Sequence, residues 1–174
     1  MKKALFLLLL VFSGTQVMAQ EKMSKTIAPS DWLTPSFQLT QQAALRMHQQ
    51  VLAKAATLQK NITFAVVDAS GQTILLVKGD GVGPHNTEAA RRKAYTALST
   101  KTSSLVLGRN AKANPDSQNL AHLPELLLLG GGVPLWHQGQ VIGAVGVAGG
   151  GGPAQDDLLA KAAALPEAGI TVHI

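Results

Sequence analysis

The residues best suited to bind a ligand lie between Gly79 and Thr100, where a loop rich in glycine and proline leads into a predicted helix. His85 stands at that junction, so we expect its imidazole outside the main core. A neutral imidazole can ligate iron, and the positive end of the adjoining helix attracts anionic groups. Four charged residues follow within two turns: Glu88, Arg91, Arg92 and Lys93.

Positive charge is concentrated around this helix. Arg91, Arg92 and Lys93 are consecutive, so their side chains spread around most of the helix and at least one is expected to face inward or across an interface. From Lys78 to Lys112 the chain has seven basic and two acidic residues, a local charge of +5. Such a patch suits a ligand that carries carboxylates. A solvated basic face with an incidental histidine is the alternative that the spacing leaves open.

Several other site classes lack support in the sequence. There is no cysteine, which excludes thiolate catalysis and cysteine-ligated metals. Nucleic-acid binding would call for stacking aromatics, and Tyr95 is the only aromatic residue of the basic segment. The glycines at 130–132 and 149–152 lack the context of a phosphate-binding loop. They predict tight turns and close approach of backbone segments. A surface of glycines without side chains also lets a flat ligand lie against the backbone.

The first 19 residues have the layout of a secretory signal peptide. Lys2 and Lys3 precede an apolar run from Ala4 to Phe12, and small residues lead to Ala19. The run is too short for a spanning helix, which needs about 20 apolar residues. We therefore expect cleavage after Ala19, export without a stable membrane anchor, and a periplasmic location if the source has two membranes. Residues 20–38 are predicted to be a flexible lead-in.

The remaining elements predict one small domain. The chain has 174 residues, of which 46% are hydrophobic and 14% charged, as expected for a single globular domain. Apolar spacing and turn residues predict a mixed α/β (α+β) order in which consecutive short strands form an antiparallel sheet of about five strands, flanked by helices. The predicted helices cover about 40–60, capped by Thr40, 86–98, capped by Asn86 or Thr87, and 154–165; the predicted strands cover 62–68, 72–78, 126–129, 133–137 and 140–147.

Four ordered blocks carry a family resemblance. They are 83–88 (GPHNTE), 91–97 (RRKAYTA), 130–134 (GGGVP) and 141–147 (VIGAVGV). The chain resembles the GlcG/HbpS-type haem-binding family, whose domain also forms the C-terminal part of PduO-type cobalamin adenosyltransferases. The resemblance covers roughly 39–165 within a domain placed at 39–174. It implies a profilin-like fold, assembly as dimers to octamers, and binding of haem or another tetrapyrrole.

The resemblance also implies roles for individual residues. His85 is the expected axial ligand of the haem iron, and Glu88 is expected to orient His85, Arg92 or Lys93. Arg92 and Lys93 are expected to contact the propionates. Gly131 and Gly132 are expected to give the ligand close access to the backbone.

The leading hypothesis is an exported haem-binding protein that sequesters, carries or senses haem without turning it over. A second hypothesis is a haem-degrading or peroxidase-like enzyme, which requires an open coordination position opposite His85. A third is an accessory module that binds small carboxylates and no haem. The expected partners are haem or a small anionic ligand and further copies of the chain, with no nucleic acid.

Overall fold

The computed structural model describes residues 32–172. The chain divides into an N-terminal unit that ends at Pro35 and a second unit from Ser36 to Ile174. The predicted signal peptide, 1–19, and residues 20–31 of the predicted lead-in lie outside the described residues. Every named helix and strand belongs to the second unit.

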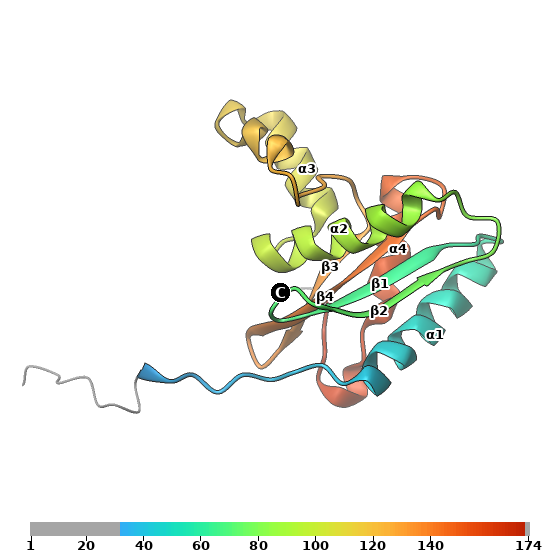
Figure 1. Cartoon of the computed structure of the whole chain (residues 1–174), viewed down its shortest axis with the longest axis horizontal. Helices are drawn as coiled ribbons and strands as arrows, with labels where there is room; N and C mark the ends of the chain where they lie inside the picture. Colours follow the sequence, from blue (N-terminus) through green and yellow to red (C-terminus); the bar gives the residue numbers. More distant parts are fainter. Residues whose placement is uncertain (1–31, 173–174) are drawn as a thin grey trace, which may run out of the picture. The chain divides into compact units, whose positions relative to one another are not determined.

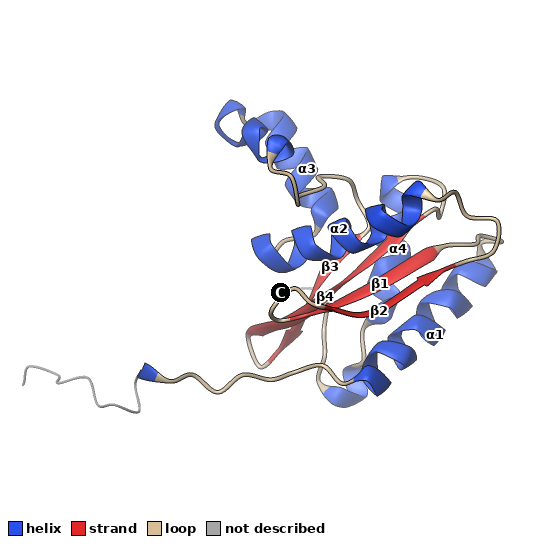
Figure 2. Cartoon of the chain, viewed as in Figure 1, coloured by secondary structure: helices blue, strands red, loops and turns tan. Residues whose placement is uncertain are grey.

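The second unit is built around one antiparallel sheet with the strand order β2-β1-β4-β3. Helix α2 covers one face of the sheet, and α1 and α4 cover the other (Figures 1 and 2). The strands are β1 (Thr63–Asp68), β2 (Thr73–Lys78), β3 (Gly132–His137) and β4 (Gln140–Ala148). The helices are α1 (Gln41–Thr57), α2 (His85–Thr100), α3 (Ser104–Ala113) and α4 (Pro153–Ala160), with 3-10 helices η2 (Pro115–His122), η3 (Lys161–Ala163) and η4 (Pro166–Ala168).

The predicted fold class, mixed α and β with an antiparallel sheet flanked by helices, is confirmed. The described residues form four strands where about five were predicted, because 126–129 is irregular. Side chains satisfy its backbone groups: the Arg92 guanidinium donates to the Leu126 carbonyl (2.7 Å) and the Leu127 N–H donates to the Thr96 hydroxyl (2.8 Å). These hydrogen bonds to side chains of α2 take the place of the backbone-to-backbone hydrogen bonds that a fifth strand would make with its neighbour.

Helix α1 forms where its pattern predicted. The Thr40 hydroxyl accepts a hydrogen bond from the Ala43 N–H (3.1 Å), the N-terminal cap expected of threonine. Its buried stripe packs on the sheet together with the large side chains of β1 and β4. The members of that stripe are Ala44, Met47, Val51 and Ala55.

The two faces of the sheet carry residues of different size. Toward α1, β1 presents Phe64 and Val66, which belong to the main core. Toward α2, the strands present mostly alanine and glycine, and the inner side of α2 is also alanine-rich. Because little side-chain volume separates them, the backbone of α2 lies close to the sheet. The small residues of this layer are Ala65, Ala90, Ala94, Ala97, Ala144 and Ala148.

Two paired glycines make the closest approach possible. Gly132 of β3 and Gly146 of β4 are register partners under α2. A Cβ on Gly132 would collide with the Lys93 carbonyl, and one on Gly146 would collide with the Ala90 carbonyl. The absence of a side chain at both positions is therefore what seats α2 on the sheet.

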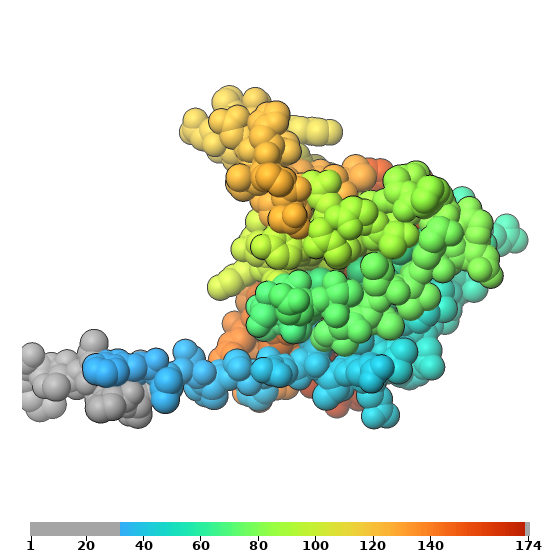
Figure 3. Space-filling view, viewed as in Figure 1, coloured from blue at the N-terminus to red at the C-terminus, as the bar shows by residue number. Residues whose placement is uncertain are grey.

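Helix α3 and η2 stand out from the layer formed by α2, as the space-filling view shows (Figure 3). Helix α3 runs to Ala113, and Asn114 caps η2 by accepting a hydrogen bond from the Asp116 N–H (3.1 Å).

We expect Gly146→Ala to destabilise the fold strongly, because the added methyl group meets the backbone of α2. Overpacking of this kind costs about 3 kcal/mol. Urea unfolding of the purified protein measures the loss. Gly139→Ala is the matched control: a Cβ there meets nothing within 4 Å, so only its positive φ of 76° is strained. The cost at that position is about 1 kcal/mol. Equal losses for the two variants would contradict the close-approach argument.

Candidate functional site

The loop that delivers His85 is fastened to the sheet at its start. The Gly79 N–H donates to the Ile62 carbonyl (2.9 Å), and the Asn61 side chain donates to the Asp80 carbonyl (2.9 Å). Val82 is buried and acts as an apolar anchor in the middle of the loop. The position of the following helix is therefore set by the end of β2 and the start of β1.

His85 is the first residue of α2 and is exposed. The helix thus begins one or two residues before the predicted caps, Asn86 and Thr87. Pro84 occupies the cap position, and the Asn86 side chain donates to the Gly83 carbonyl (3.2 Å). The imidazole lies against Gly83, since a Cβ there would lie 3.1 Å from its Cε1 atom. Among the residues that the structure describes, none makes a hydrogen bond or ion pair with the imidazole, so both ring nitrogens are available.

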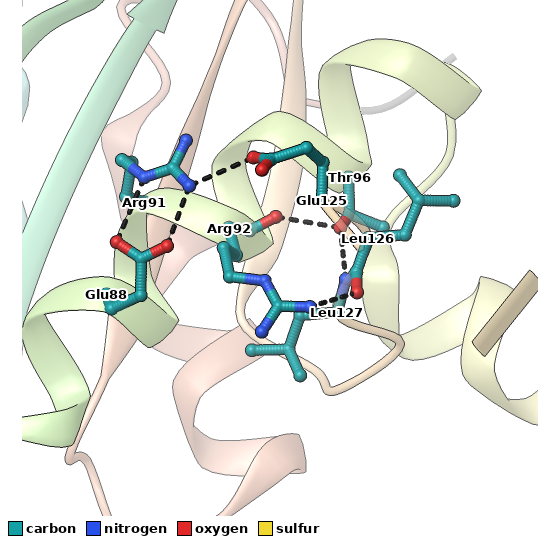
Figure 4. A network of polar contacts seen from close by, with 7 residues as sticks. All are labelled: Glu88, Arg91, Arg92, Thr96, Glu125, Leu126 and Leu127. Atoms are coloured by element: carbon teal, nitrogen blue, oxygen red, sulfur yellow. Dashed lines mark hydrogen bonds and ion pairs between the residues drawn. The ribbon is translucent and has the colours of Figure 1, made fainter. Parts of the chain in front are cut away.

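Glu88 lies one turn further on and is held by Arg91 (Figure 4). Arg91 donates from Nε (3.0 Å) and Nη2 (2.7 Å) to Glu88, and from Nη2 to Glu125 (3.0 Å). The hydrogen bonds from Arg91 lower the pKa of Glu88, although its slight burial opposes the shift. Glu88 and, secondarily, Glu125 raise the pKa of Arg91. Glu88 is therefore an anion at neutral pH, with its carboxylate bound to Arg91 and not to His85.

Arg92 is half-buried and points toward the irregular segment after η2 (Figure 4). Its Nη2 donates to the Leu126 carbonyl (2.7 Å). Its Nε is buried and has no hydrogen-bond partner among the described residues. The guanidinium thus retains donor capacity that the protein itself does not use.

Lys93 faces the interior, with an exposed fraction of 1%. Its Nζ donates to the Asp156 carboxylate (2.7 Å) and to the Val147 carbonyl (3.0 Å). The other carboxylate oxygen of Asp156 accepts from the Gly150 N–H (2.7 Å). The prediction that one of the three consecutive cations faces inward is confirmed. Lys93 joins α2, the end of β4 and α4, which leaves it unavailable to a ligand on the surface.

Gly131 and Gly132 lie beside Lys93 and are buried. A Cβ on Gly131 would lie 3.2 Å from Lys93 Nζ and 2.8 Å from Asp156 Cβ. The Ser104 hydroxyl fixes this turn, since it accepts from the Gly132 N–H (2.8 Å) and donates to the Leu129 carbonyl (2.8 Å). The two glycines expose their backbone to close approach, as predicted. The groups that approach it are α2 and α4, which leaves no room for a ligand there.

The structure thus divides the predicted site into two groups. His85, Glu88 and Arg92 lie on or near the surface of α2. Lys93, Gly131 and Gly132 form a buried junction two turns along the helix from His85. The basic residues of the 78–112 segment are spread over β2, α2, the connection after α2 and α3, and Glu125 neutralises part of their charge.

Sequence reasoning missed the acidic partners of these cations. The Glu88-to-Arg91 pair could have been found from its i, i+3 spacing, which is favourable on a helix. Asp156 and Glu125 lie 63 and 34 residues from their partners, so no local pattern connects them.

Two other described histidines, His48 and His137, have structural surroundings, and His122 is exposed. His48 packs on Phe64 with ring centroids 5.4 Å apart, and burial lowers its pKa, as expected for a boundary histidine. His137 contacts Phe37 and bonds to the Gly169 carbonyl (3.1 Å). In the described range 32–172, no group of three or more His, Asp or Glu side chains is placed to hold a metal ion. None of the helices within that range is long and apolar enough to cross a membrane.

The fold is an antiparallel sheet with helices on both faces, and an exposed histidine begins the helix that covers one of them. Comparisons with known proteins identify the family. The family model described as "Haem degrading protein HbpS-like" matches residues 39–165. The chain belongs to this HbpS-like family, which confirms the resemblance given by its four sequence blocks.

Solved structures and a curated relative agree with this assignment. A crystal structure of HbpS has 34% identity and a TM-score of 0.70, with coverage of 75% of this chain and 91% of that one. Klebsiella pneumoniae ORFY has 32% identity and a TM-score of 0.70 over the same shares. An uncharacterised 15.0 kDa protein of Citrobacter freundii is 36% identical over 127 residues, which are 72% of this chain and 89% of that protein.

The domain also matches part of a larger enzyme. The corrinoid adenosyltransferase PduO of Citrobacter freundii is 28% identical, over 75% of this chain and 39% of the enzyme. A structure described as a PduOC–haem complex has the same fold, with a TM-score of 0.69, at 24% identity over 79% of this chain and all of that one.

We expect Lys93→Met to destabilise the protein by about 4 kcal/mol, because it leaves the Asp156 carboxylate buried without its cation. Thermal and urea unfolding measure the loss. The double variant Lys93→Met/Asp156→Leu should recover part of it, since it removes both charges. Arg91→Met is the surface control and should cost about 1 kcal/mol or less. A Lys93 variant as stable as this control would contradict the structural role assigned to the pair.

Proposed function

We propose that this protein binds haem at the start of α2, with His85 as the axial ligand of the iron. The observation that carries the proposal is an exposed imidazole, without a protein partner in the described part of the chain, at the positive end of a 16-residue helix. Membership of a family described by haem degradation supports the choice of ligand. So does the PduOC–haem complex, which shares the fold.

The protein's own residues fit this ligand in distinct ways. A neutral imidazole nitrogen of His85 is a suitable iron ligand, and the helix end favours the negative charge of the propionates. Arg92 is half-buried, its single bond to the Leu126 carbonyl leaves other guanidinium N–H groups unused by the described residues, and it is the proposed propionate contact. Glu88 keeps Arg91 in place and thereby shapes the charged border of the site. Bound haem would supply iron redox chemistry and would absorb in the visible range.

The buried junction has a supporting role in this proposal. Lys93, Gly131 and Gly132 hold α2 against the sheet and so fix the direction of its first turn. We therefore exclude Lys93 from the residues proposed to contact propionates.

We also propose that the haem site is completed by a second copy of the chain. His85 and Glu88 are exposed, so a flat macrocycle held there by one chain would leave much of its apolar surface in water. Covering that surface is favourable by about 25 cal/mol per Å². A homo-oligomer, from dimer to octamer, would provide the cover.

A haem-degrading activity is the second candidate function, and the family description is the observation that favours it. It differs from storage, transport or sensing in that the bound haem is consumed when a reductant is supplied. Binding of a small carboxylate without haem is the third candidate. It would use the same helix end and Arg92.

We expect a haemin titration of the protein to give a saturable, shifted Soret band that is lost in His85→Ala, because the variant removes the iron ligand. Arg92→Met should weaken binding about tenfold, the effect of losing about 1.4 kcal/mol of ion pairing. His122→Ala, an exposed histidine elsewhere, is the matched control and should bind as the unaltered protein does.

The outcomes separate the candidate functions. Haem binding that survives in His85→Ala would show that another residue is the iron ligand. A spectrum without any saturable shift would exclude haem as the ligand and favour binding of a small carboxylate. Loss of the Soret band after addition of ascorbate to the complex, with His85 intact, would favour degradation over sequestration, transport or sensing.

We propose, finally, that the protein is exported and that residues 1–19 are removed. The proposal rests on the sequence of this segment, which is outside the described residues. Expression of the full chain in a two-membrane bacterium should yield a periplasmic protein. Its intact mass should equal that of a chain whose first residue is Gln20. Leu8→Arg should block export by breaking the apolar run, and an unprocessed cytoplasmic product from the unaltered chain would refute the proposal.

A further inference from the structure

A second candidate binding site lies at the other end of α2. A cavity of about 300 Å³ opens between the end of α2, the start of α3 and strand β3. Since α2 has 16 residues, its two ends are about 24 Å apart, and this cavity is separate from His85. Its lining residues are Lys101, Thr102, Ser103, Val106, Pro134, Trp136, Lys161 and Val172.

The cavity combines apolar walls with a positive border. Pro134, Trp136 and Val172 supply apolar surface. Lys101 is exposed, and the side chain of Lys161 is half-exposed, so both amines are accessible from water. Asp157 is the acidic group next to these two lysines. Its negative charge offsets one of their two positive charges, so a net charge of +1 remains.

Asp157 bonds to Ser103 and Lys161, so it leaves Lys101 able to pair with the anion of a ligand. Its carboxylate is buried, accepts a hydrogen bond from the Ser103 hydroxyl (2.6 Å) and pairs with Lys161 Nζ (2.7 Å). Lys101 has no acidic partner among the residues described. It ends α2 in the left-handed conformation, with a φ of 52°.

In the described part of the chain, two kinds of N–H group near the cavity have no side-chain acceptor. Ser103 is the N-terminal cap residue of the ten-residue helix α3; its hydroxyl donates to Asp157 and accepts no capping bond from the described residues. The first turn of α3 contains no acidic residue. In addition, the indole Nε1 of Trp136 is buried and without a partner among the described residues. An anion in the cavity would be favoured by the positive end of α3 and by the amines of Lys101 and Lys161.

We propose that this cavity binds a small organic carboxylate with an apolar, aromatic or branched body. The carboxylate lies at Lys101, Lys161 and the start of α3, and the apolar body packs on Pro134 and Trp136. The volume of the cavity suits a molecule of about ten to fifteen heavy atoms, and pockets of this size commonly combine apolar walls with a few polar groups.

The test uses the indole N–H resonance of Trp136 in the haem-free protein. The chain has two tryptophans, so Trp32→Phe leaves Trp136 as the only source of that signal. The probe is 3-phenylpropionate, compared with its neutral amide, 3-phenylpropanamide. We expect a saturable shift with the acid and at least tenfold weaker binding of the amide.

Two lysine variants make the test specific. Lys101→Gln in the same background should weaken binding of the acid at least tenfold, and Lys161→Gln provides a second, independent loss. Lys112→Gln, an exposed lysine of α3 outside this cavity, is the matched control and should leave binding unchanged.

Three results would overturn the proposal: no saturable shift with the acid, equal affinity for the acid and the amide, or unchanged affinity in Lys101→Gln. Because no haem is present and His85 is intact, failure here leaves the haem proposal standing. Failure of the haemin titration likewise leaves this cavity standing.

Discussion

The close approach of α2 to the sheet is the constraint on which the rest of this structure depends. At Gly132 and Gly146 there is no room for a side chain between the strands and the carbonyls of the helix. A helix held by large side chains can shift or rotate as those side chains change rotamer. A helix seated on backbone has a single position, and both of its ends are fixed with it.

That constraint determines the fate of the cations on α2. Once the helix is seated, Lys93 has no route to water, and its ammonium needs an acceptor inside the protein. Asp156 supplies one, which in turn draws α4 and the 149–152 glycine turn against β4. Arg91 and Arg92 point away from the sheet and remain near the surface. Neighbouring residues of the same charge thus have different roles because of their direction around the helix.

The same helix separates two candidate binding regions. Its N-terminal end carries His85, where the favourable features are an exposed imidazole and a positive helix end. Its C-terminal end meets the start of α3, where a second positive helix end, two lysines and an apolar wall surround a cavity. The contact of α2 with the sheet fixes the position of both helix ends, and groups that are held in place before binding lose less entropy when a ligand binds.

The sequence by itself determined the class of fold, the family and most of the elements. Apolar periodicity, turn residues and capping by Thr40 are local signals, and they locate α1, β1, β2, β3 and β4 well. The sequence also indicated that His85 stands where a loop enters a helix, outside the main core. It predicted a strand at 126–129, where an apolar run looks the same whether a strand or side-chain bonding satisfies its backbone. Only the tertiary structure decided that Lys93 is buried and that Gly131 and Gly132 serve the seating of α2. Those roles depend on contacts between residues far apart in the chain, and local spacing carries no information about which distant backbone a glycine or a lysine will meet.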